Sequence, residues 1–371
     1  MTMNSSLSAP QPDRRGAKSI LALPSVTVVM PNYNHSRFLK ASISAIVNQS
    51  HPPDRFLIID DASTDDSWAL ISRLAKQYPL IEARRNEVNL GAVKSLELGF
   101  QLTSTEYILF SAADDLVAPD LLRRSLELLS QHPMASLCSA LSMEIDEDGR
   151  SRGLYRSPII ATSPIYLPPQ DVIGSLLRYD SWIMGNTTVY RKAALEEIGG
   201  FPHLRGFSDG AACIKMGASH GLCFIPAVLG AWRRMGTGIA MQTFRNTESA
   251  LEMIPPVKDY LRHGPGSALL LQYVDQWERV WRYFTAISAG GEDRKSWVTA
   301  VQLAIGASNA VDYFVLLLLR NNGFLGRSMI KFYLFIRLRG WRPLLTKLRL
   351  WLLAKRSGIS KANAATIFIQ T

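Results

Sequence analysis

Cysteine is scarce in this chain, and the few present follow no pattern. The 371 residues include three cysteines, Cys138, Cys213 and Cys223, which lie neither in close pairs nor at the spacing of metal ligands. This usage favours a reducing compartment over a disulfide-stapled secreted fold, so we expect a cytoplasmic protein. The composition, 47% apolar and 19% charged, indicates a globular chain with room for one large domain and an appendage.

Several familiar motifs are also missing. The sequence has no Gly-x-Gly-x-x-Gly, no phosphate-cradling Gly-Lys-Ser/Thr loop and no Gly-x-Ser-x-Gly elbow. His203 and His220 have no partner at ligand spacing, so we expect them in loops or at the surface. The apolar patch that ends at Pro24 is too short for a signal-peptide core, and no cleavable signal is expected. The chemistry must therefore lie in other residues.

Acidic residues are absent from the end of the chain. Eleven Lys and Arg follow Asp312 and no Asp or Glu does, whereas residues 1–312 contain 30 basic and 31 acidic residues. The net charge of +10 therefore belongs to the C-terminal end. Residues 341–353 mix leucine and tryptophan with Lys and Arg, which is typical of a helix lying in a membrane interface. A buried helical cap is the alternative. Nucleic-acid binding is not expected, because these charges do not form a polar face.

The chain divides into three regions. Residues 1–24 are rich in Ser, Pro and small polar types and predict a disordered arm. Residues 25–240 predict the main domain, and residues 241–371 a helical, basic and amphipathic region. Within the last region, residues 297–319 are apolar over a spanning length, but Gln302, Ser308, Asn309 and Asp312 interrupt them. A membrane-spanning helix there is therefore doubtful.

The main domain begins with alternating strands and helices. Apolar runs at 26–30, 56–59 and 107–110 read as buried strands, and the segments between them have helical spacing. This rhythm predicts an α/β fold, with a mostly parallel sheet flanked by helices. Further along, we expect strands at 182–190 and 222–228, and a helix at 209–218. The expected architecture is this sheet followed by a C-terminal α-helical extension.

Two of the predicted strands run directly into pairs of aspartates. Phe56–Ile59 leads to Asp60-Asp61, and Tyr107–Phe110 leads to Asp114-Asp115. Ligands of open α/β sheets gather at the carboxyl ends of the strands. Four carboxylates there would repel one another unless a cation or many donors lay between them. The pattern therefore predicts a metal-bound, phosphorylated ligand.

Four motifs in order carry a family resemblance. They are residues 31–34 (Pro-Asn-Tyr-Asn), 59–65 (Ile-Asp-Asp-Ala-Ser-Thr-Asp), 89–91 (Asn-Leu-Gly) and the aspartates 114–115. Over roughly residues 25–235 the chain resembles family 2 glycosyltransferases of the GT-A fold. The resemblance implies an inverting, metal-dependent transfer of a sugar from a nucleotide-diphospho-sugar to an acceptor hydroxyl.

The first two motifs suit a nucleotide. The resemblance assigns nucleotide binding to Pro31, Tyr33 and Asp61. The Tyr33 ring could stack on a base, and Asp61 could accept a hydrogen bond from an imide N–H. Helix capping is the alternative for both Asp60 and Asp61, and for Asp60 the two readings are evenly matched. Lys94 matches a basic position near the ribose or diphosphate, and a solvated lysine is the alternative.

Asp114 and Asp115 form the metal site that the resemblance implies. Mg²⁺ or Mn²⁺ prefers one or two carboxylates together with the phosphate oxygens of its ligand. The commonest form of the motif is Asp-x-Asp-Asp, but residue 112 is alanine, so one carboxylate is missing. We expect Asp115 to be the direct ligand, while Asp114 supports it and the donor. A turn and helix cap before Pro119 is the alternative.

Asp209 is the candidate catalytic base. Many family members have Glu-Asp where this chain has Ser208-Asp209. Residues 198–201 match the segment that precedes this motif in the family. A helix N-cap is the alternative. Arg233 and Arg234 follow the next strand and could hold diphosphate oxygens or remain solvated.

The resemblance and the basic tail together suggest a partner. We expect a glycan or lipid-linked acceptor at the cytoplasmic face of the membrane, used in cell-envelope polysaccharide synthesis, with peripheral contact through the C-terminal region. A nucleotide-sugar-binding protein without turnover is the alternative, prompted by Ala112 and Ser208.

Overall fold

The fold is taken from a computed structural model, which describes residues 22–155, 158–180, 182–235, 243, 246–288, 294–305, 312, 314, 317 and 331–339. Most of the predicted arm and all of residues 341–353 lie outside these ranges. The strands are β1 (Val26–Asn32), β2 (Arg55–Asp60), β3 (Ile81–Arg85), β4 (Tyr107–Phe110), β5 (Leu116–Val117), β6 (Leu137–Ile145), β7 (Ser151–Leu154), β8 (Ile165–Leu167), β9 (Val189–Arg191) and β10 (Leu222–Arg233). The helices are α1 (Ser36–Val47), α2 (Ser67–Gln77), α3 (Ala92–Leu102), α4 (Leu121–Gln131), α5 (Pro169–Tyr179), α6 (Lys192–Glu197), α7 (Ser208–His220), α9 (Thr247–Glu252), α10 (Ile254–Arg262), α11 (Ser267–Ser288) and α12 (Arg294–Ile305), with short 3₁₀ turns η1 (Gly185–Thr187) and η2 (Arg205–Phe207) and a π-helical turn η4 (Phe335–Arg339).

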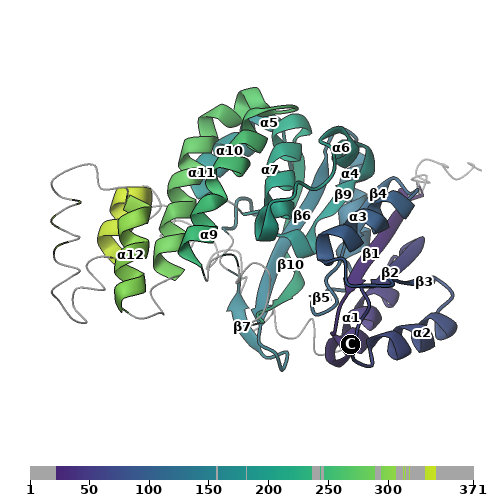
Figure 1. Cartoon of the computed structure of the whole chain (residues 1–371). Helices are drawn as coiled ribbons and strands as arrows, with labels where there is room; N and C mark the ends of the chain where they lie inside the picture. The colour runs from purple at the N-terminus through teal and green to yellow at the C-terminus, as the bar shows by residue number, and fades with distance from the viewer. Residues whose placement is uncertain are drawn as a thin grey trace, which may run out of the picture.

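Ten strands of the described residues form one sheet flanked by helices, which confirms the α/β prediction (Figure 1). The main order is β3-β2-β1-β4-β9-β6-β10-β5, with β7 beside β6 and β8 beside β10. Strands β1 to β4 pair in parallel. Beyond them the sheet is mixed, because β9 lies antiparallel between β4 and β6. The parallel part is therefore smaller than "mostly parallel" implies.

The inner strands β1 and β2 of the parallel half are buried on both faces. Val26, Val28, Val29 and Met30 of β1 have no exposed surface, as expected for a central strand with helices on either side. Helix α3 approaches β1 closely at Gly99, where a Cβ would lie 2.2 Å from Val29 Cγ1. Only a glycine leaves room for this contact.

Gly99→Ala is expected to lower the free energy of unfolding by about 1–3 kcal/mol, because the added methyl overpacks the interface between α3 and β1. Gly174→Ala in α5 is the matched control, since a Cβ there meets nothing within 4 Å. That change is expected to be neutral or to stabilise by about 0.5–1 kcal/mol. Urea denaturation of both variants measures the difference, and equal midpoints would contradict the contact.

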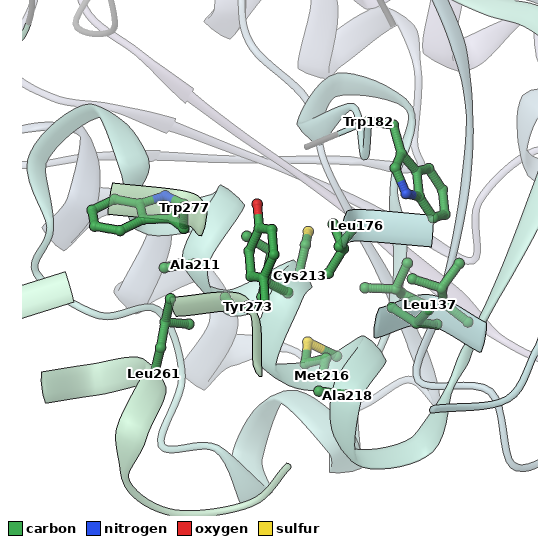
Figure 2. Packing of buried hydrophobic residues seen from close by; sticks show 14 of the residues in the cluster. Leu137, Leu176, Trp182, Ala211, Cys213, Met216, Ala218, Leu261, Tyr273 and Trp277 are labelled. Carbon is green, nitrogen blue, oxygen red and sulfur yellow. The ribbon is translucent and has the colours of Figure 1, made fainter. Parts of the chain in front are cut away.

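Helix α7 forms the centre of the second half. Its Ala211, Cys213 and Met216 are buried against Leu176 of α5 and Tyr273 of α11 (Figure 2). Helices α10 and α11, from beyond residue 240, thus pack on the same core as the sheet. The predicted boundary at residue 240 therefore does not separate two cores.

The last described helices form a smaller cluster of their own. Ala300 and Val301 of α12 pack with Leu334 and Leu338. The carboxylate of Asp312 is buried and pairs with Arg337, with Nε to Oδ1 at 3.2 Å. None of the helices described has the length and hydropathy needed to cross a membrane. Of residues 297–319, only 297–305, 312, 314 and 317 are described.

Two predicted strands differ from the structure. Residues 182–190 do not form one strand: η1 occupies Gly185–Thr187, and β9 begins at Val189. The Thr188 hydroxyl donates to Met184 O at 2.7 Å, which closes a turn that strand periodicity does not reveal. Strand β10 runs on to Arg233 rather than ending at 228.

Candidate active site

The candidate residues converge on one edge of the sheet. Strands β1, β2 and β4 are parallel, and β10 runs in the same direction because β9 reverses the pairing on both of its sides and β6 is parallel to β10. Their carboxyl ends therefore meet at the same edge. This edge is where α/β sheets bind ligands.

Asp60 is satisfied entirely by protein groups. Its buried carboxylate accepts hydrogen bonds from Asn32 Nδ2 at 2.8 Å and Ser63 N at 3.2 Å, and Arg85 Nε lies 3.3 Å from Oδ2. Helix α2 begins at Ser67, beyond reach of a capping role for Asp60, and Asp65 accepts from the Ser67 N–H instead. Asp60 thus ties together the loops that follow β1 and β2.

Asp61 organises the Asn-Leu-Gly turn. It is 2% exposed and accepts hydrogen bonds from Asn86 Nδ2 (2.7 Å), Leu90 N (2.9 Å) and Gly91 N (2.7 Å). Gly91 has φ of +90°, which favours glycine. These bonds place Asp61 beside the start of α3 and explain why the second and third motifs occur together.

The other predicted nucleotide contacts lie in and after β1, which pairs with β2, and at the start of α3. Tyr33 follows β1, and the residue is 41% exposed, so its ring is accessible to a planar ligand. Pro31 is paired with Ile59 within the sheet. Lys94 is exposed on the first turn of α3. Their positions are compatible with the predicted roles.

Asp115 is buried at the turn between β4 and β5. It is 5% exposed, and its Oδ1 accepts the Arg233 N–H at 2.8 Å. Asn186 also donates a hydrogen bond to this carboxylate. Burial, and secondly the neighbouring charge of Asp114, raise the pKa of Asp115 well above its ordinary value. The N-cap position of α4 is Asp120, so neither acid caps that helix.

These residues fit a divalent cation. The raised pKa indicates that protein groups do not fully compensate two adjacent carboxylates, and Asn186 Oδ1 is a buried acceptor without a partner. Within the described residues, no three His, Cys, Asp or Glu side chains converge as a complete ligand set. One or two carboxylates completed by phosphate oxygens is the arrangement that Mg²⁺ prefers.

Arg233 and Arg234 differ sharply. Arg233 is 6% exposed. Its Nε donates to Asp114 O at 2.7 Å, and its Nη1 donates to the carbonyls of Asp146 (2.9 Å) and Glu147 (3.0 Å). Its guanidinium also lies over the Phe38 ring. The solvated alternative is therefore wrong for Arg233, which clamps the turn that carries Asp114 and Asp115, whereas Arg234 is exposed.

Arg233→Lys is expected to lower the free energy of unfolding by about 2 kcal/mol. Lysine keeps the charge, but its single ammonium group cannot donate to all three carbonyl oxygens as the planar guanidinium does with Nε and Nη1. Arg234→Lys, one residue along, is the control and should stay within about 0.5 kcal/mol. Equal urea midpoints for the two variants would show that the clamp contributes little.

Asp209 lies in the first turn of α7. The N-cap residue is Phe207, and no side chain caps this helix, so capping does not explain Asp209. Asp209 is an exposed residue, yet the protein atoms around its carboxylate raise its pKa by desolvation, against the opposing effect of the Gly210 N–H. An accessible carboxylate with a raised pKa suits a general base.

The structure adds residues that sequence reasoning missed. Gly185 lies against the Asp209 carboxylate and Asn186 contacts Asp115, both from η1. A glycine inside an apparent strand was the available signal. In addition, Phe207 packs on Trp277 and Trp281 of α11, so the C-terminal helices support the turn that carries the base.

Comparison with known proteins agrees with this geometry. Residues 27–199 match the model of Glycosyl transferase family 2. This segment, somewhat less than half of the chain, is similar to the family 2 glycosyltransferases, and the fold is of the GT-A type. An uncharacterized glycosyltransferase of Haemophilus influenzae is 26% identical over 176 residues, 47% of this chain and 54% of that protein. The putative teichuronic acid biosynthesis glycosyltransferase TuaG of Bacillus subtilis is 27% identical over 34% of this chain and 50% of its own length. The matches thus span about half the length of these relatives.

Solved structures share the fold at low identity. S. aureus TarS 1–349 in complex with UDP-GlcNAc has a TM-score of 0.56 at 14% identity, covering 90% of this chain and 92% of that one. The mannosyltransferase PcManGT of Pyrobaculum calidifontis, in complex with GDP-Man and Mn²⁺, has a TM-score of 0.54 at 20% identity, covering 85% and 86%.

Proposed function

We propose that this protein is an inverting glycosyltransferase that moves a sugar from a nucleotide-diphospho-sugar to an acceptor hydroxyl. The shared edge of the sheet carries the proposal, since it gathers the Asp61 turn, the buried Asp115 and the η1 turn that lies beside Asp209. Tyr33 is exposed there for a base. The matches to proteins whose structures are in complex with UDP-GlcNAc and with GDP-Man support this class of donor.

In the proposed mechanism, Asp209 accepts the proton of the acceptor hydroxyl while that oxygen attacks the anomeric carbon. The bond to the diphosphate breaks on the opposite side, and its electron pair leaves with the nucleoside diphosphate, so the configuration inverts. Asp115, supported by Asp114, would hold Mg²⁺ or Mn²⁺. The chemistry that such an ion supplies when bound is compensation of charge on the diphosphate. Arg233 contributes indirectly, by fixing the Asp114 and Asp115 backbone.

The acceptor is proposed to be a glycan or lipid-linked precursor of the cell envelope, presented at the cytoplasmic face of a membrane. The likeness to a relative named for teichuronic acid biosynthesis supports the acceptor class. The basic C-terminal sequence and the exposed Phe314, Leu317 and Phe332 support peripheral membrane contact. Truncation after residue 339 retains Leu334 and Leu338 in their cluster. The truncated protein should lose binding to anionic vesicles, and unchanged binding would refute contact through residues 340–371.

Donor screening tests the enzyme assignment. UDP- and GDP-sugars are added with Mn²⁺, and melting temperature and nucleoside diphosphate release are both measured, because a ligand stabilises in proportion to its affinity. We expect one donor to raise the melting temperature and to be turned over slowly even without acceptor. Stabilisation without any release, also in the presence of acceptor glycans, would favour a binding protein that lacks turnover.

A further inference from the structure

The η1 turn is anchored firmly to strand β6. The Thr187 hydroxyl donates to Ala140 O at 2.8 Å, and the Met184 N–H donates to Ser139 Oγ at 3.2 Å. Close packing against β10 adds to this, since a Cβ at Gly230 would lie 2.4 Å from Thr187 Cγ2. The turn is thus held by two neighbouring strands of the sheet and presents its residues at fixed places.

One side of the turn meets the candidate base. A Cβ on Gly185 would lie 2.3 Å from Asp209 Oδ2, which is closer than real contacts allow. The φ of Gly185 is not positive, so backbone conformation does not demand glycine here. The reason for glycine is the space that the Asp209 carboxylate occupies.

The other side of the turn meets the candidate metal ligand. Asn186 Nδ2 donates to Ser142 Oγ at 3.1 Å, and its side chain also donates to the Asp115 carboxylate. Adjacent residues of one rigid turn therefore contact the two acids to which the proposed function gives different tasks.

We propose that Gly185 and Asn186 are positioning residues that set where the base lies relative to the metal-holding carboxylate. This inference rests on the proposed function. Gly185 leaves the space in which Asp209 faces the acceptor, and Asn186 holds Asp115 in the orientation of a ligand. Neither residue touches the reacting atoms, and each acts through its neighbouring acid.

Gly185→Ala tests the first half. The added methyl displaces the Asp209 carboxylate, and a displacement of about 1 Å is expected to lower kcat about 100-fold. The dissociation constant of the donor with Mn²⁺ should stay within about twofold, because the nucleotide contacts are unaffected. The melting temperature provides a second readout: the penalty of Gly185→Ala should disappear when Asp209→Ala is also present, since only the Asp209 carboxylate crowds the new Cβ. A penalty that persists would overturn the inference.

Asn186→Leu tests the second half, because leucine keeps the volume but cannot donate. The Mn²⁺ concentration for half-maximal donor binding, measured by calorimetry without turnover, should rise about 10–100-fold. Gly174→Ala serves as the control and should change neither kcat nor the Mn²⁺ requirement. If wild type transfers sugar and both site variants match it in kcat and Mn²⁺ requirement, the inference is wrong. If wild type itself neither binds nor transfers any donor, the proposed function fails instead.

Discussion

Asp209→Asn is expected to lower kcat for sugar transfer by about 10²–10⁴-fold, the usual contribution of a general base. The amide has nearly the same shape but cannot accept the proton of an acceptor hydroxyl. Donor binding should remain, because Tyr33 and Asp61 follow β1 and β2, whereas Asp209 is carried by α7. Kinetic assay with the cognate acceptor, together with calorimetry of donor binding, measures both effects.

The control is Asp171→Asn, which removes the acid from the first turn of α5 just as the test removes it from the first turn of α7. It should leave kcat unchanged. Equal losses in both variants would point to a general effect of helix-terminal charge, and full activity of Asp209→Asn would remove Asp209 from the mechanism.

The pH dependence has a definite sign. Desolvation raises the pKa of Asp209 above the ordinary value of 3.8, and the base works only when deprotonated. Activity should therefore rise with pH through that raised pKa, so the acidic limb of kcat/KM should lie above pH 3.8. The pH profile of the residual activity of Asp209→Asn should lack this acidic limb. A limb at or below the ordinary carboxylate range would contradict the raised pKa.

Asp115→Asn is expected to weaken Mn²⁺-dependent donor binding about 100-fold. The substitution removes the charge that attracts the cation, while the amide oxygen can still accept the Arg233 N–H. Donor affinity without metal should change little. Calorimetric titration of the donor, with Mn²⁺ and with chelator, measures the donor affinity with and without metal separately.

Asp120→Asn is the matched control for Asp115, since Asp120 is a nearby acid that pairs with Ser50 and Arg123 at the start of α4. It should leave the metal dependence as in wild type. A wild-type protein that binds its donor equally well with chelator would instead show that the acid pair has another use.

The sequence predicted those parts of the site that local patterns encode. Strand ends followed by Asp60-Asp61 and Asp114-Asp115 are short-range signals, and parallel pairing brings them to one edge. Contacts between distant segments were beyond such patterns. The roles of Arg233 and Asn186 depend on the antiparallel pairing of β9 within the sheet. The spacing of apolar residues does not reveal the direction in which a strand pairs.

The C-terminal region shows the same limit. Aromatic residues in 277–284 predicted a helix but not its partner, since packing of Trp277 and Trp281 on Phe207 joins segments some 70 residues apart. Asp312 was read as an interruption of an apolar stretch, whereas its buried pairing with Arg337 gives it a partner within the fold. Membrane contact of residues 341–353 stays a prediction.

The product of a single reaction tests the central claim most directly. The protein is incubated with the donor selected by screening, Mn²⁺ and an acceptor glycan, and the anomeric configuration of the product is read by NMR. We predict release of the nucleoside diphosphate, a new glycosidic bond of inverted configuration, and loss of both in Asp209→Asn. A product that retains the donor's configuration, or tight donor binding with neither release nor product, would contradict the account.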